Sequence, residues 1–296
     1  MSSYLTSIIL QYIPSKPVQQ PRERYVNYMQ DLYKLFGDQV TEESFLEGSQ
    51  CAYTEIGDVL FNEAKKMRQL VDIDMFVINH WAHEFDPEYA ACGPYFLYTH
   101  KFDCNHFDIC DQGTIGILTA LKIISQYQYQ CASKNAVLLV MEQTTVPRNK
   151  FAYDPIPILA GGALFWIDSN PKSDARKLRI IAIDFIHQAE VIEKGWNALA
   201  TIQEVCRKFQ IAEENLSVFV SKSSFAYKSL QYALDASWQK QGFVLRFMDH
   251  LPGMLPFAKV LQSFMHNEKA CTKYSLLFQE DAESAEIGYL LLGSGV

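Results

Sequence analysis

Hydrophobic positions along this chain fall into short runs of two kinds. Runs rich in aliphatic residues are typical of strands in a sheet covered on both faces; they cover 3–12, 71–79, 136–141, 158–167, 216–220, 274–278 and 286–292. Runs with helical spacing cover 57–70, 115–124, 198–209 and 254–265. Two shorter strands, 106–110 and 243–247, each lead through a polar turn with glycine into one of the helical runs. This alternation predicts an α/β protein with helices packed on its sheet.

The same order of elements occurs twice. Val77 in an early strand is echoed by Val220, and Leu139 in a later one is echoed by Leu277. Repetition of one order of elements within a chain indicates duplication. We therefore expect an N-terminal half over residues 1–170 and a C-terminal half over residues 171–296.

The composition of the chain argues against several classes of partner and location. The 296 residues are 49% hydrophobic and 20% charged, and the net charge of −8 with no basic run argues against nucleic acid or an anionic membrane as partner. No apolar stretch is long enough to span a bilayer. Seven scattered cysteines, together with an N-terminus that has no basic region before its apolar run, predict reduced thiols and a cytoplasmic location.

A motif in the first half resembles the ketoacyl-ACP synthase III branch of the thiolase-fold enzymes. Residues 107–113 (Phe-Asp-Ile-Cys-Asp-Gln-Gly) match the strand and turn that carry the family's nucleophilic cysteine to the start of a buried helix. Counted without a gap from Asp108, the cysteine's position is Gly113; aligned on the helix, it is Thr114. The resemblance implies a thiolase-like layered αβαβα fold with two pseudo-repeated halves.

The second half resembles the family but lacks its other catalytic residues. The family's strand ending in Pro-His-Gln-Ala-Asn supplies a histidine, and residues 220–224 (Val-Ser-Lys-Ser-Ser) place Ser221 there. The family's asparagine lies in a turn before a helix, and the matching turn has Gly253 and no asparagine. Condensation needs a thiolate together with donors that stabilise an enolate oxyanion. The resemblance therefore implies a degenerate site.

Such chains pair with an active ketosynthase and shape its acyl channel, like a chain length factor. By this resemblance we expect a non-catalytic subunit, paired with a catalytically active ketosynthase or with itself, that serves condensation on acyl carrier protein or CoA thioesters. Neither a cofactor nor a metal site is expected.

Two alternatives remain open. In the first, the chain is an active acyltransferase or condensing enzyme with a rewired nucleophile, such as Cys110 or Thr114. In the second, it is a non-enzymatic module that binds an acyl chain or a carrier protein. In either case Asp111, His250 and His80 are candidates to line a residual pocket, because they lie at strand ends or in turns where α/β sheets bind ligands.

Overall fold

The computed structural model describes residues 2–13, 27, 30–31, 34, 52–67, 72–80, 91–110, 112–131, 133–142, 160–171, 177–192, 195–234, 242–248, 253–266, 273–281, 284 and 286–294. Within these ranges the chain forms one sheet with the strands β1 (Ser3–Tyr12), β2 (Met75–His80), β3 (Asn105–Ile109), β4 (Asn135–Glu142), β5 (Gly161–Asp168), β6 (Leu178–Ile186), β7 (Leu216–Ser221), β8 (Val244–Met248), β9 (Tyr274–Asp281) and β10 (Glu286–Ser294). The helices are α2 (Tyr53–Met67), α3 (Cys92–His100), α4 (Gly116–Cys131), α5 (Gln188–Ile192), α6 (Ala198–Phe209), α7 (Phe225–Leu234) and α8 (Met254–His266).

The order of strands across the sheet is symmetric about its middle. It runs β3-β2-β4-β5-β1-β6-β10-β9-β7-β8, so that each half contributes the same arrangement from edge to centre. The register agrees with this symmetry. Met75 pairs in parallel with Asn105 and Ala136, and Ser217 pairs in parallel with Val244 and Ser275. The two pseudo-repeated halves are therefore confirmed, whereas their division at residues 170 and 171 stays a prediction.

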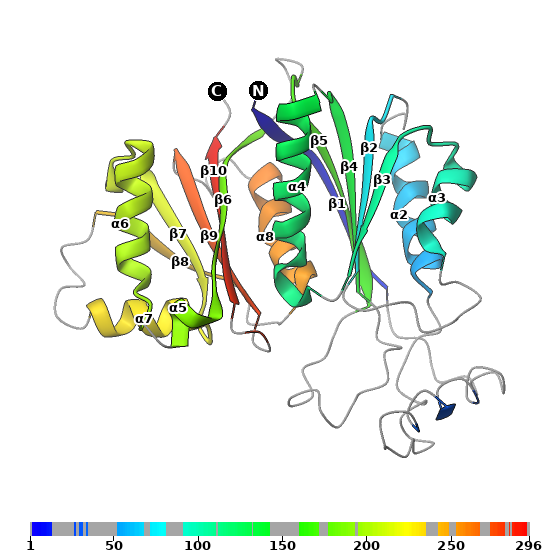
Figure 1. Ribbon diagram of the computed structural model, residues 1–296. Coiled ribbons are helices and arrows are strands. Elements are labelled where there is room, and N and C mark those ends of the chain that lie inside the picture. The colour runs from blue at the N-terminus through cyan, green and yellow to red at the C-terminus, as the bar shows by residue number, and fades with distance from the viewer. Residues whose placement is uncertain are drawn as a thin grey trace.

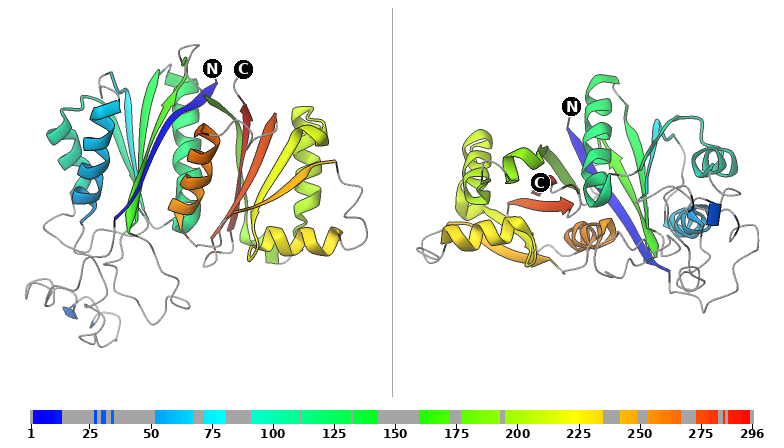
Figure 2. Two further views of the ribbon diagram at one scale, coloured as in Figure 1. Left: turned by 180° about the vertical axis from the view of Figure 1, so that it is seen from behind. Right: turned by 60° about the horizontal axis from the view of Figure 1, so that its bottom comes forward.

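Helices and sheet halves alternate in five layers (Figure 1). α2 and α3 cover the outer face of the N-terminal strands, and α6 and α7 cover the outer face of the C-terminal strands. α4 and α8 lie side by side between the two halves of the sheet (Figure 2). The αβαβα layering expected from the sequence is confirmed. None of the helices in the described ranges is long and apolar enough to cross a membrane.

Alternation along the strands explains why the layers form. In β4, Ala136, Leu138 and Val140 belong to the central hydrophobic cluster with α4 and α8. Val137, Leu139 and Met141 belong to the outer cluster with α2 and α3. Successive side chains of a strand point to opposite faces, so a continuous apolar run requires cover on both sides.

Gly161 and Gly162 lie in a strand, although two consecutive glycines are typical of a tight turn. Both residues open β5 and pair with β1. A Cβ on Gly162 would lie 2.6 Å from a methyl carbon of Leu60 and 2.9 Å from the carbonyl oxygen of Val140. Glycine is needed here because α2 packs closely on the sheet, not because the chain reverses.

Candidate functional site

The segment that resembles the family's nucleophile turn lies where β3 leads into the central helix. A single 3-10 turn, Gly113–Ile115, continues directly into α4. Gly113 has φ +51, a left-handed conformation that residues with a Cβ adopt at a cost. Thr114 is buried, and its hydroxyl donates a hydrogen bond to the backbone carbonyl of Glu280. Both candidate nucleophile positions therefore lie at the N-terminal end of the central helix.

The space beside Gly113 is filled by a carboxylate from the other half of the molecule. Asp281, the last residue of β9, is 6% exposed. Its carboxyl carbon lies 2.6 Å from the point where a Cβ on Gly113 would stand. The same carboxylate accepts hydrogen bonds from the backbone N–H of Thr114 at 3.3 Å and of Ser284 at 2.9 Å. No side chain fits at position 113 while Asp281 holds this place.

The pseudo-symmetric position in the second half has the same arrangement. Glu142, the last residue of β4, is 1% exposed, and one of its oxygens lies 2.8 Å from the Cβ position on Gly253. It accepts a hydrogen bond from the backbone N–H of Met254, the first residue of α8. Burial raises the pKa of Glu142 to about 8, and the backbone N–H groups of Met254 and Leu255 oppose that rise.

A third carboxylate caps a helix on the outer layer. Glu280, in β9, accepts hydrogen bonds of 2.6 Å from the backbone N–H groups of both Phe225 and Ala226, at the start of α7. Burial raises the pKa of Glu280, while these backbone donors lower it. Three helix N-termini around the C-terminal ends of the strands are thus occupied by carboxyl groups of this chain, whose oxygens accept hydrogen bonds from the backbone N–H groups there.

The other described residues predicted for the site lie at strand ends, and the register of β2 with β3, in which Asn79 pairs with Ile109, places His80 and Cys110 at neighbouring strand ends. Ser221 ends β7, and its hydroxyl lies 3.1 Å from that of Ser223. His80 ends β2, is 6% exposed and packs on the ring of Tyr53, with 4.9 Å between ring centroids; its place in a pocket stays a prediction. Cys110 follows β3 as a partly buried cysteine. Asp111 and His250 lie outside the described residues.

Asn79 is a buried residue beside this turn that sequence reasoning missed. It lies near the end of β2, is 1% exposed and donates a hydrogen bond of 3.2 Å to the carbonyl of Ile109. Its amide nitrogen lies 2.6 Å from the Cβ position on Gly116, the first residue of α4. The close packing of Asn79 against Gly116 fixes the path of the chain from β3 into the central helix.

The arrangement restricts the chemistry at the end of α4. Acyl transfer through a covalent intermediate needs an activated nucleophile, and it needs donors aimed at the oxyanion. At position 113 there is no side chain, and the N–H of Thr114 already donates to Asp281. A carboxylate at this point also repels an incoming anion. The described residues here form a capped helix start in which position 113 has no side chain and the N–H of Thr114 is bonded to Asp281.

Comparison with known proteins identifies the fold of this chain. No family model matches the sequence, and no curated protein matches it. AbyA1, a tetronic acid condensing enzyme, matches in structure with a TM-score of 0.64 at 9% identity, over 99% of this chain and 100% of that chain. A 3-oxoacyl-(acyl-carrier-protein) synthase III matches with a TM-score of 0.61 at 12% identity, over 99% and 100%.

The ishigamide ketosynthase/chain length factor matches with a TM-score of 0.56 at 12% identity, over 77% of this chain and 75% of that chain. The chain has the thiolase-like fold. The candidate site lies at the end of the central helix pair of this fold.

Proposed function

We propose that this chain is a non-catalytic thiolase-like subunit that pairs with an active condensing enzyme and shapes its acyl channel. The observation that carries the proposal is the pair Gly113 and Asp281. In a thiolase-like fold the start of the central helix is where the resemblance puts the nucleophile, and in this chain a carboxylate fills that space. The structural match to a ketosynthase/chain length factor also supports this proposal.

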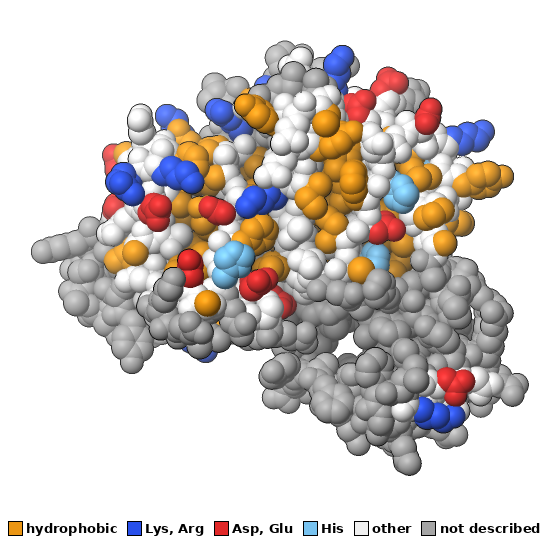
Figure 3. Space-filling view, in the orientation of Figure 1, with side chains coloured by type: hydrophobic (Ala, Val, Ile, Leu, Met, Phe, Trp, Pro, Cys, Tyr) orange, Lys and Arg blue, Asp and Glu red, His pale blue; other side chains and the backbone are white. Residues whose placement is uncertain are grey.

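The sheet edge at β3 supports pairing with a partner chain. Within the described residues β3 pairs on one side only, with β2, and Asn105, Phe107 and Asp108 are exposed. Phe107 is 42% exposed and contacts Tyr127 of α4, with 6.4 Å between ring centroids. Tyr129 near the end of α4 is 69% exposed. Figure 3 shows hydrophobic side chains gathered over α4 and this neighbouring edge.

An exposed edge strand can pair with another chain, and Phe107 gives this edge an exposed apolar side chain. We propose that the partner adds its own strand to β3, which extends the sheet across the interface. The partner is a cysteine-containing ketosynthase, and its substrate is an acyl group on carrier protein or CoA.

Native mass spectrometry tests the proposal. The chain is expressed alone and together with a ketosynthase encoded beside it, and an acyl thioester is added to each sample. We expect a heterodimer in which the acyl mass appears on the partner only. A stable homodimer that carries the acyl group on this chain contradicts the proposal. An adduct that disappears in Cys110→Ala assigns the rewired nucleophile instead.

A further inference from the structure

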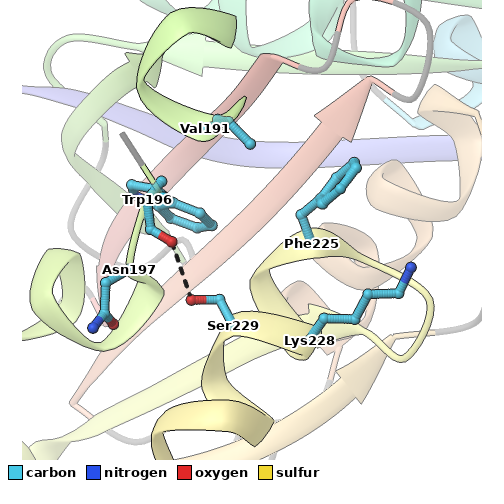
Figure 4. Close-up of a pocket in the computed structure, with 7 residues that line it drawn as sticks. Val191, Trp196, Asn197, Phe225, Lys228 and Ser229 are labelled. Atoms are coloured by element: carbon cyan, nitrogen blue, oxygen red, sulfur yellow. Dashed lines mark hydrogen bonds between the residues drawn. The ribbon is translucent and has the colours of Figure 1, made fainter. Parts of the chain in front are cut away.

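An open cleft lies on the outer layer, between α7 and the segment that joins α5 to α6 (Figure 4). Its volume is about 450 Å³, within the range of roughly 300–1,000 Å³ typical of small-molecule sites. Val191, Trp196 and Asn197 line one side, and Phe225, Lys228 and Ser229 line the other. Phe225, Lys228 and Ser229 follow helical spacing, so one face of α7 forms a wall.

Hydrogen bonds hold the aromatic side of the cleft in place. The indole N–H of Trp196 donates to the hydroxyl of Thr201 at 2.8 Å. The backbone N–H of Ala198 donates to the hydroxyl of Ser229 at 3.0 Å, and that hydroxyl lies 3.4 Å from the carbonyl of Trp196. α7 is therefore tied to the start of α6, and the ring of Trp196 faces the cleft (Figure 4).

The lining combines two aromatic rings with one positive charge. Phe225 is 44% exposed, and the ammonium of Lys228 lies 5.5 Å from its ring centroid. None of the described lining residues is acidic. Glu280 is not part of the lining; its carboxylate accepts hydrogen bonds from the backbone N–H groups of Phe225 and Ala226 and also interacts electrostatically with Lys228. The cleft therefore offers two aromatic rings beside the positively charged ammonium of Lys228.

The cleft is separate from the start of the central helix. Glu280 and Asp281 are consecutive in β9, so their side chains point to opposite faces of the sheet. Glu280 contacts α7 in the outer layer, and Asp281 contacts Gly113 and Thr114 next to the central layer. A ligand in the cleft therefore lies across the sheet from the site of the proposed function.

We propose that this cleft binds a small aromatic carboxylic acid, with its ring between Trp196 and Phe225 and its carboxylate at Lys228. Stacking on two aromatic side chains favours a planar ring over a flexible chain. The ammonium of Lys228 favours an anion. Asn197 lines the opposite side of the cleft, where its side chain caps α6 by accepting hydrogen bonds from the backbone N–H groups of Leu199 and Ala200. The proposal does not depend on the pairing of this chain with a ketosynthase.

Binding of 2-naphthoate to the chain alone, measured by isothermal titration calorimetry, tests this site. We expect 2-naphthoate to bind more tightly than the uncharged 2-naphthamide and more tightly than octanoate, which has the charge but no ring. Lys228→Met, which keeps the aliphatic stem, weakens naphthoate binding about fivefold and leaves naphthamide binding unchanged. Phe225→Leu weakens both aromatic ligands.

Lys208→Met is the matched control, because Lys208 also lies 5.5 Å from an aromatic ring, that of Phe209, but neither residue lines the cleft. Loss of naphthoate binding in Lys208→Met equal to that in Lys228→Met overturns the proposal. Equal affinity for naphthoate and naphthamide, tighter binding of octanoate, or no binding of naphthoate at millimolar concentration overturns it as well. None of these results bears on acylation or pairing, so the two proposals fail separately.

Discussion

The carboxyl carbon of Asp281 lies 2.6 Å from the point where a Cβ on Gly113 would stand. Asp281 ends β9, a strand of the second half, and Gly113 opens the central helix of the first half. Glu142 at the end of β4 and Gly253 before α8 repeat the relationship in the opposite direction. Each half therefore supplies the carboxyl group that caps the central helix of the other, and this exchange joins the two halves at the N-terminal ends of the central helices.

Alanine at position 113 is expected to destabilise the chain much more than alanine at another left-handed glycine. Gly195 has φ +62 with no atom within 4 Å of its Cβ position, so Gly195→Ala carries only the backbone cost of about 1 kcal/mol. Gly113→Ala adds a collision with Asp281, and we expect a total loss of about 3 kcal/mol. Chemical denaturation measures the free energy of unfolding of both variants. Equal losses in the two would show that Asp281 does not fill the space beside position 113.

Glu142 gives the folding equilibrium a pH dependence. Its pKa is about 8 in the folded state, against about 4.5 for an ordinary glutamate, so folding favours the protonated form. Glu142 therefore makes its full contribution to the free energy of unfolding below pH 4.5. That contribution is lost as the pH rises through 8, and the free energy of unfolding falls by at most about 1.4 kcal/mol per pH unit. In Glu142→Gln we expect a flatter curve of unfolding free energy between pH 5.5 and 8.5. Parallel curves for the two proteins would contradict this account.

His100 gives a dependence of the opposite sign. It packs on the ring of Phe61 with 4.3 Å between centroids, and its nitrogen lies 3.3 Å from a carboxylate oxygen of Asp58. Burial lowers the pKa of His100, with Asp58 opposing. The stability from this group is therefore present above about pH 6.5 and is lost as the pH falls below it. Between pH 6.5 and 5, the free energy of unfolding of His100→Gln is expected to fall less than that of the wild type. An equal fall in the two proteins would show that His100 does not cause this pH dependence.

If the partner binds at the β3 edge, a charge placed on this strand is expected to prevent formation of the heterodimer. Phe107→Glu places a charge on the exposed edge strand, and we expect it to abolish the heterodimer in native mass spectrometry. Phe247 on the other sheet edge, β8, is 48% exposed, and Phe247→Glu is the matched control. We expect the control to keep the heterodimer. Loss of pairing in Phe247→Glu with retention in Phe107→Glu would move the interface to the opposite edge.

Much of the fold follows from local patterns. α6 occupies the predicted range because Asn197 caps its first backbone N–H groups and Gln210 ends it in a left-handed conformation. β4 follows from an apolar run that must be covered on both faces. α3 was missed because Gly93 and Pro94 stand in its first turn, where proline is tolerated but hides the helical pattern. β6 was missed because polar residues such as Asp184 interrupt its alternation.

The site was predictable only in part. The absence of cysteine at positions 113 and 114 is visible in the sequence, but what fills the space is not. Asp281 reaches Gly113 through the fold, and no local pattern links residues so far apart. One signal was available: Glu142 and Asp281 end equivalent strands of the repeat, and acids at equivalent positions suggest a shared task.

Intact-protein mass spectrometry after incubation with a hexanoyl N-acetylcysteamine thioester tests the central claim most directly. The wild-type chain is compared with Gly113→Cys/Asp281→Gly, which puts a thiol at the start of the central helix and removes the carboxylate that fills its place. We predict no hexanoyl adduct on the wild type and an adduct on the double variant. A hexanoyl adduct on the wild-type chain would contradict the claim that it carries no nucleophile of its own.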